Sequence, residues 1–129
     1  MKIKEKIKLH SWSRDSFAFW ERYGITENIL KEYNVHSVKS IKYKPEANEI
    51  SFDSSQNVFA YWVSNECFKV YQPESRKMKF SWLGLKPKEY VFGFDQLPDE
   101  GEVIFIAAGE KDVLSLKAMG YASICFNSE

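Results

Sequence analysis

The sequence lacks several features that mark common classes of protein. Its two cysteines, Cys67 and Cys125, stand alone, so neither a Cys-x-x-Cys zinc site nor a disulfide framework is expected. The two histidines, His10 and His36, have no nucleophile or carboxylate at a catalytic spacing, and we assign them no role. No apolar run approaches the roughly 20 residues that cross a bilayer, and the Lys-rich start lacks a signal-peptide core. These absences predict a soluble cytoplasmic protein with no membrane partner.

The chain also lacks net charge, since it holds 18 basic and 18 acidic residues. The charges are nevertheless unevenly spread. Residues 1–44 contain ten Lys or Arg against five Asp or Glu, and residues 66–88 contain six against two. Residues 89–129 contain two against eight. A basic body with an acidic end suits a protein that touches phosphates in one place and metal ions in another. Ordinary solvated surface charge is the simpler alternative.

Two short helices are predicted near the start of the chain. The composition, 44% hydrophobic and 16% aromatic, can furnish a core for a chain of 129 residues. Residues 13–24 have a polar start, apolar positions at helical spacing, and Gly24 as a stop. Residues 25–34 begin with Thr26 as a good N-cap and end with Asn34, which tolerates the left-handed region. Residues 1–10 fit either a strand or a linker.

From Val35 onward the apolar pattern has a period of two, which is typical of strands. Polar turns separate the apolar pairs at spacings of about ten residues, and short turns of this kind favour an antiparallel meander. The predicted strands contain Ile41 and Tyr43, Ile50 and Phe52, Val58 to Val63, Phe68 and Val70, and Met78, Phe80 and Trp82.

The last segment predicts a strand–helix–strand unit. "VIFIA" (residues 103–107) reads as a buried strand, Val113, Leu116 and Met119 follow at helical spacing, and "ASICF" (residues 122–126) reads as a second strand. Such a βαβ unit belongs in a parallel sheet. We therefore predict an α+β fold with a helical pair and an antiparallel meander in residues 1–100, followed by a βαβ unit in residues 101–129.

The turn "AGEKD" lies between that strand and that helix. Glu110 and Asp112 are two residues apart there, and hard cations such as Mg²⁺ prefer carboxylate oxygen. Both residues therefore are candidate metal ligands and catalytic residues. The alternative is that they only favour the helix N-terminus through its dipole.

The segment "YQPESRKMKFSW" interleaves cations with aromatic residues near a hairpin, a mixture that suits single-stranded nucleic acid. The alternative places Phe80 and Trp82 in the core and treats the charges as ordinary for an exposed hairpin. The candidate nucleic-acid-binding residues are Arg76, Lys77 and Lys79, with Lys69 and Lys86 as weaker candidates.

The segment "IFIAAGEKDVLSLKAMGYASICFNSE" resembles the opening of a Toprim domain in bacteriophage-type primase-helicases. Upstream, "FWERYGITENILKEYNV", "CFKVYQPESRKMKFSWLG" and "YVFGFDQLP" resemble, in order, parts of the RNA-polymerase domain of those enzymes. The resemblance covers nearly the whole chain. It implies a DNA primase fragment that makes RNA primers on single-stranded DNA from nucleoside triphosphates, with Mg²⁺ held by Toprim carboxylates.

The resemblance has two departures. The family's leading acidic residue falls on Ala108, whereas Gly109, Glu110 and Asp112 match the motif. The later Asp-x-Asp motif of the family is not in this sequence, so we expect a chain that stops inside a Toprim fold and is inactive alone. The rest of the Toprim domain and a helicase domain are the implied partners. The alternative function is a non-catalytic module that binds single-stranded nucleic acid or another protein.

Overall fold

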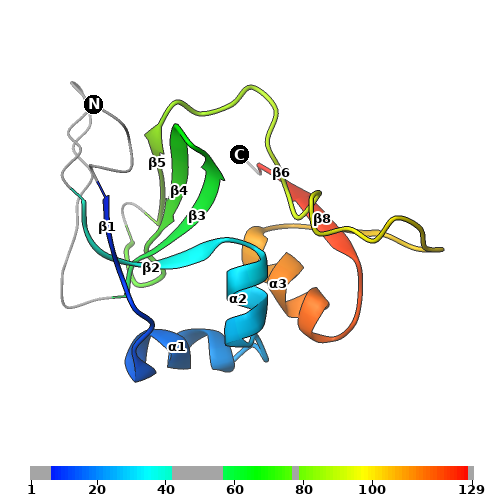
Figure 1. Ribbon diagram of the computed structural model, residues 1–129, viewed down its shortest axis with the longest axis horizontal. Helices are drawn as coiled ribbons and strands as arrows, with labels where there is room; N and C mark the ends of the chain where they lie inside the picture. Colours follow the sequence, from blue (N-terminus) through cyan, green and yellow to red (C-terminus); the bar gives the residue numbers. More distant parts are fainter. Residues whose placement is uncertain (1–6, 42–56, 77–78, 128–129) are drawn as a thin grey trace. The chain divides into compact units, whose positions relative to one another are not determined.

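The computed structural model describes residues 7–41, 57–76 and 79–127. The fold is α+β, with three helices and an antiparallel meander of strands, as the sequence predicts (Figure 1). The chain divides into two compact units, residues 1–16 with 34–86 and residues 17–33 with 87–129. This division differs from the expected boundary at residue 100, because the second helix belongs with the βαβ unit and not with the meander.

The elements of the two units follow the chain order. The first unit holds the strands β1 (Ile7–His10), β2 (Val35–Ile41), β3 (Phe59–Ser64), β4 (Cys67–Tyr71) and β5 (Phe80–Gly84). The second unit holds α2 (Glu27–Glu32), β6 (Val91–Phe92), β7 (Phe105–Ala107), α3 (Glu110–Ala118) and β8 (Ser123–Phe126). The boundary between the units falls inside α1 (Arg14–Glu21).

Local capping explains where the first two helices begin and end. At the start of α1 the backbone N–H of Ser16 donates to Ser13 Oγ at 3.1 Å, and the N–H of Ser13 donates to Ser16 Oγ at 2.9 Å. This reciprocal pair satisfies two backbone donors at the helix start. Thr26 caps α2 by accepting from the Ile29 N–H, and Asn34 has the positive φ of 55° that ends a helix. The predicted helix ends are therefore confirmed.

The five strands of the first unit form one antiparallel sheet in the order β1-β2-β3-β4-β5, which confirms the predicted meander. Residues 7–10 are its first strand, which resolves the choice between a strand and a linker. The predicted strand positions Tyr43, Ile50, Phe52 and Met78 lie outside the described residues.

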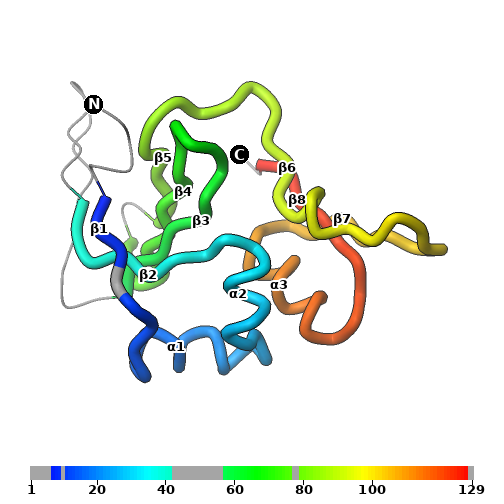
Figure 2. The backbone as a smooth tube through the Cα atoms, viewed as in Figure 1, coloured from blue at the N-terminus to red at the C-terminus, as the bar shows by residue number. Residues whose placement is uncertain are grey.

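The two faces of this sheet differ in chemistry, because side chains alternate along each strand. The inner face forms the core cluster, in which Ile7 of β1 and Leu83 of β5 are both buried. Since β1 and β5 are the first and last strands of the sheet, the sheet must curl to bring them into one cluster (Figure 2). The other face carries Phe59, Tyr61 and Tyr71. The centroid of the Tyr71 ring lies 6.3 Å from that of Phe59 and 6.1 Å from that of Tyr61.

Cys67 and Cys125 are both free and fully buried. Burial raises the pKa of the Cys67 thiol to about 11. A thiol in this environment stays protonated at neutral pH and reacts slowly. Cys67 is therefore a packing residue of β4.

The second unit contains the predicted βαβ unit. Strands β7 and β8 pair in parallel and α3 connects them, while β6 pairs with β8 in the antiparallel direction (Figure 2). The helices α2 and α3 contact each other through a Lys117–Glu32 ion pair at 3.6 Å. Ser115 Oγ also donates to the carbonyl oxygen of Tyr23 at 3.2 Å.

The expectation that residues 103–107 form a buried strand is wrong. Val103 is 65% exposed and Ile106 is 67% exposed, although the strand itself is present as β7. Strand β7 lies at the edge of the sheet, and the face that carries Ile106 is not the one that carries the buried Cys125. Met119, predicted to lie on the buried face of the helix, is also exposed. The buried side of α3 is instead made by Val113 and Leu114.

No helix within residues 7–41, 57–76 and 79–127 is both long enough and apolar enough to cross a membrane.

The end of β5 depends on a glycine. Gly84 has a φ of 97°, and a Cβ atom there would clash with the carbonyl oxygen of Glu66, which also accepts from the Leu85 N–H at 3.1 Å.

We predict that Gly84→Ala lowers the free energy of unfolding by about 2–4 kcal/mol. The matched control is Gly24→Ala, where φ is also positive but nothing lies within 4 Å, and where we expect a loss of about 1 kcal/mol. Urea unfolding of both variants measures the difference, and equal losses would contradict the role of the clash.

Candidate nucleic-acid interface

Four residues on β4, β5 and the segment after β5 form a strip of alternating cations and aromatic rings. Lys69 pairs with Trp82 across the two strands, and Tyr71 pairs with Phe80. The pairing places these side chains on the sheet face opposite the core cluster. We call Lys69, Phe80, Trp82 and Lys86 the cation–aromatic strip.

Cation–π contacts connect the members of the strip. The Lys69 Nζ lies 4.8 Å from the centroid of the Phe80 ring and 5.5 Å from that of Trp82. The Lys86 Nζ lies 5.3 Å from the Trp82 ring centroid on the same strip. Each distance is within the range of about 6 Å in which a ring attracts a cation. The strip therefore holds two positive charges against two aromatic rings.

The Phe80 ring stacks on a neighbouring ring and is partly exposed to solvent. It stacks on the Tyr71 ring with centroids 4.9 Å apart and an angle of 11° between the planes. Tyr71 is buried, whereas Phe80 is 45% exposed and Trp82 is half-buried. The alternative that placed Phe80 in the core is therefore wrong. Phe80 lies on β5, the last strand of the sheet within the described residues, and on the face opposite the core cluster.

The basic hairpin lies beside this strip. Arg76 and Lys79 are exposed in the connection between β4 and β5, and Lys77 lies outside the described residues. The backbone N–H of Gln72 donates to the carbonyl oxygen of Lys79 at 2.7 Å, which closes the base of the hairpin. Lys69, in contrast, is only 5% exposed and lies beneath the rings, so its charge acts on the strip and not directly on solvent. The structure thus brings together Lys69, Lys86, Phe80 and Trp82, with Arg76 and Lys79 at the end of the strands.

The second predicted site, the acidic turn, is arranged differently from the expectation. Glu110 is the first residue of α3, and Gly109 precedes it in an extended conformation with no side-chain cap. A metal role for Glu110 requires that its carboxylate lie beside Asp112 and be open to solvent. Glu110 is instead 3% exposed, and its Oε2 accepts from the hydroxyl of Tyr90, which lies before β6, at 2.8 Å. The requirement of solvent access is therefore not met.

The acidic turn therefore offers only part of a metal site. Asp112 is exposed, while Glu110 is already engaged with Tyr90. Among the described residues, no three His, Cys, Asp or Glu side chains are grouped closely enough to hold a metal ion. Divalent cations held by proteins usually need several oxygen ligands. The described residues at this turn do not fit a Mg²⁺ cage.

No sequence pattern indicates the role of Tyr90. It lies in a stretch that reads as an irregular loop, twenty positions before its partner Glu110.

Comparisons with protein family models, with curated proteins and with solved structures found no match to this chain. The resemblance to Toprim primases therefore stays a prediction.

We predict that the Tyr90–Glu110 contact supports the fold. Tyr90→Phe and Glu110→Gln should each lower the free energy of unfolding by about 1–2 kcal/mol, since each leaves a buried polar group with a poorer partner. The two losses should not add in the double variant, because both substitutions act on the same hydrogen bond: Tyr90→Phe removes its donor and Glu110→Gln weakens its acceptor. Urea unfolding of the two single variants and the double variant measures this coupling. Additive losses would mean that the two side chains act independently.

Proposed function

We propose that this chain binds single-stranded nucleic acid through the cation–aromatic strip. The observation that carries the proposal is Phe80, whose ring stacks on Tyr71 and lies close to the Lys69 ammonium while the residue remains 45% exposed. Exposed aromatic rings next to cations are the platform on which proteins stack unpaired bases. Buried core aromatics or isolated surface charges do not provide that combination.

The chemistry of the strip assigns a role to each of its parts. A base stacks on Phe80 and Trp82, whose faces accept the π surface of any base without regard to sequence. Lys86, Arg76 and Lys79 lie on and next to the strip and attract the phosphates. Lys69 holds its charge against both rings from below and fixes their positions. This arrangement supports sequence-tolerant binding of a single strand.

We also propose a biological role for this binding. The cation–aromatic strip and the resemblance of the sequence together support a cytoplasmic protein of the primase class, in which this chain holds the single-stranded DNA template. Mg²⁺-dependent nucleotidyl transfer from nucleoside triphosphates is the catalytic part of that proposal. It has the weaker support, because Ala108 replaces the leading acid and Glu110 is bonded to Tyr90. Binding without catalysis by these residues is therefore the function that the geometry supports best.

We predict that Phe80→Ala weakens binding of a short oligodeoxynucleotide by about 1–3 kcal/mol, the contribution of one base stacked on an aromatic ring. The matched control is Phe94→Ala, which removes an aromatic side chain that is 64% exposed and lies outside the strip. Fluorescence anisotropy of a labelled strand measures both affinities. Equal affinities for Phe80→Ala and the unaltered protein would exclude stacking on this ring.

The basic hairpin should act through its charge. We predict that the double change Arg76→Ala with Lys79→Ala flattens the log–log dependence of the binding constant on salt by roughly 0.7 for each lost phosphate contact. The control is Arg14→Ala with Lys39→Ala, which removes the same charge from two exposed residues outside the hairpin. A slope that changes equally in both variants would mean that only net charge matters. An unchanged slope would assign Arg76 and Lys79 to solvated surface.

A further inference from the structure

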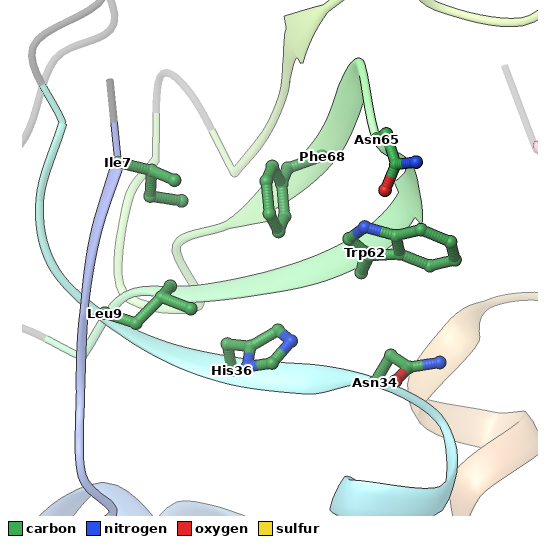
Figure 3. Close-up of a pocket in the computed structure, with 7 residues that line it drawn as sticks. All are labelled: Ile7, Leu9, Asn34, His36, Trp62, Asn65 and Phe68. Carbon is green, nitrogen blue, oxygen red and sulfur yellow. The ribbon is translucent and has the colours of Figure 1, made fainter. Parts of the chain in front are cut away.

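A pocket of about 520 Å³ lies on the inner side of the five-stranded sheet. This volume is within the about 300–1,000 Å³ that is typical of small-molecule sites. Its lining comes from β1, the start of β2, the end of β3, the following turn and β4 (Figure 3). The residues that line it are Ile7, Leu9, Asn34, His36, Trp62, Asn65 and Phe68.

The floor and one wall of this pocket are apolar and aromatic. Phe68 is 3% exposed and belongs to the core cluster, and the half-buried Trp62 packs against the same cluster. The His36 ring meets the Phe68 ring edge-on, with centroids 6.4 Å apart and an angle of 75° between the planes. Figure 3 shows Ile7 and Leu9 on the β1 side of Phe68. These surfaces are fixed by the core and suit a flat, apolar ring.

Two side-chain amides lie near Trp62 at the other side of the pocket (Figure 3). Asn34 has the left-handed backbone conformation, with a φ of 55°. Its backbone carbonyl oxygen accepts from the backbone N–H of Trp62 at 3.0 Å. Asn65 lies in the tight turn between β3 and β4, where the Glu66 N–H donates to Ser64 Oγ at 3.2 Å. The backbone at both amides is therefore set by the fold. Each amide presents both a donor and an acceptor.

The pocket is neutral as well as aromatic. None of the described residues that line it is Lys, Arg, Asp or Glu. Burial lowers the pKa of His36 below its usual value, so the imidazole is uncharged at neutral pH. A neutral imidazole supplies one further donor and one further acceptor. Among the described lining residues a charged ligand has no partner of opposite charge, whereas a neutral ring with a polar edge matches them.

We propose that this pocket binds a nucleobase, a neutral heteroaromatic ring whose edge carries donors and acceptors. Trp62 and Phe68 contact the ring, and the Asn34 and Asn65 amides with His36 meet its polar edge. The base belongs either to a free nucleoside or to one residue of a strand. Because Phe68 and Lys69 are neighbours on β4 and point to opposite faces of the sheet, the pocket and the cation–aromatic strip are separate sites. This inference therefore does not depend on the proposed function.

The test follows the NMR signals of the Trp62 indole N–H and of the Asn34 and Asn65 side-chain amides. The probes are the four ribonucleosides at millimolar concentration, a short mixed-sequence oligodeoxynucleotide, and indole as a flat ring with a smaller polar edge. We expect at least one nucleoside or the oligonucleotide to shift these signals, and indole to bind more weakly. Shifts by nucleosides identify a free base as the ligand, and shifts by the oligonucleotide alone identify a base within a strand.

The double variant Asn34→Gly with Asn65→Ser removes both amides. Glycine accepts the positive φ at position 34 and serine suits a turn, so the fold should be retained. We expect binding about tenfold weaker for each amide that bonds the base, and so up to about a hundredfold weaker when both amides do. The control is Asn57→Ser in the same unit, outside the pocket, which should bind as the unaltered protein does.

Three results would overturn the nucleobase pocket: no shift by any nucleoside or by the oligonucleotide, equal binding of indole and nucleosides, or unchanged affinity in the double variant. The proposed function is judged separately. Phe80→Ala changes the affinity for the oligonucleotide through the strip and should leave nucleoside shifts at Trp62 unchanged. Loss of one site with retention of the other distinguishes the two proposals.

Discussion

The alternation of side chains along β4 is the constraint on which the first unit depends. All five residues of this strand are buried, although it pairs with β3 on one side and with β5 on the other and so has two faces to satisfy. Phe68 and Val70 complete the inner core, and Lys69 and Tyr71 point the opposite way. A buried lysine is costly unless its charge has partners. The Phe80 and Trp82 rings lie close to the Lys69 ammonium, so the aromatic residues of β5 help to stabilise the buried cation on β4.

Because β4 contributes side chains to both faces of the sheet, the two faces carry side chains of different chemistry. The outer face has cations against partly open rings, which suits a charged, flexible strand. The inner face has amides and an imidazole at the mouth of an apolar core, which suits a neutral ring. A register shift of one residue in β4 would exchange these faces and place Lys69 in the core. The antiparallel pairing of Lys69 with Trp82 and of Phe68 with Leu83 thus fixes both surfaces at once.

Local features of the sequence were sufficient to predict most of the fold. Thr26 and Asn34 act on backbone groups a few residues away, so the ends of α2 were readable without tertiary information. The period of two after Val35 likewise predicted the meander, and the βαβ pattern predicted the parallel pairing of β7 with β8. The placement of α2 in the same unit as α3 was not readable. It depends on contacts such as Lys117 with Glu32, which join residues far apart in the chain.

The candidate sites also depend on contacts between residues far apart in the chain, which local sequence patterns do not predict. Alternation predicts which face a side chain occupies, but it does not predict what covers that face. One interpretation of the sequence placed Phe80 in the core, yet it is 45% exposed, whereas the metal hypothesis required an open Glu110, which is buried and bonded to Tyr90. The apolar β7 shows why such errors arise: strands of parallel sheets are usually apolar on both faces because both are usually covered. In the second unit Ile106 and Phe126 lie on a face that remains exposed, while Cys125 and Val113 are fully buried. Hydrophobicity thus records the capacity of a side chain to be buried, and only the packing partners decide whether that burial occurs.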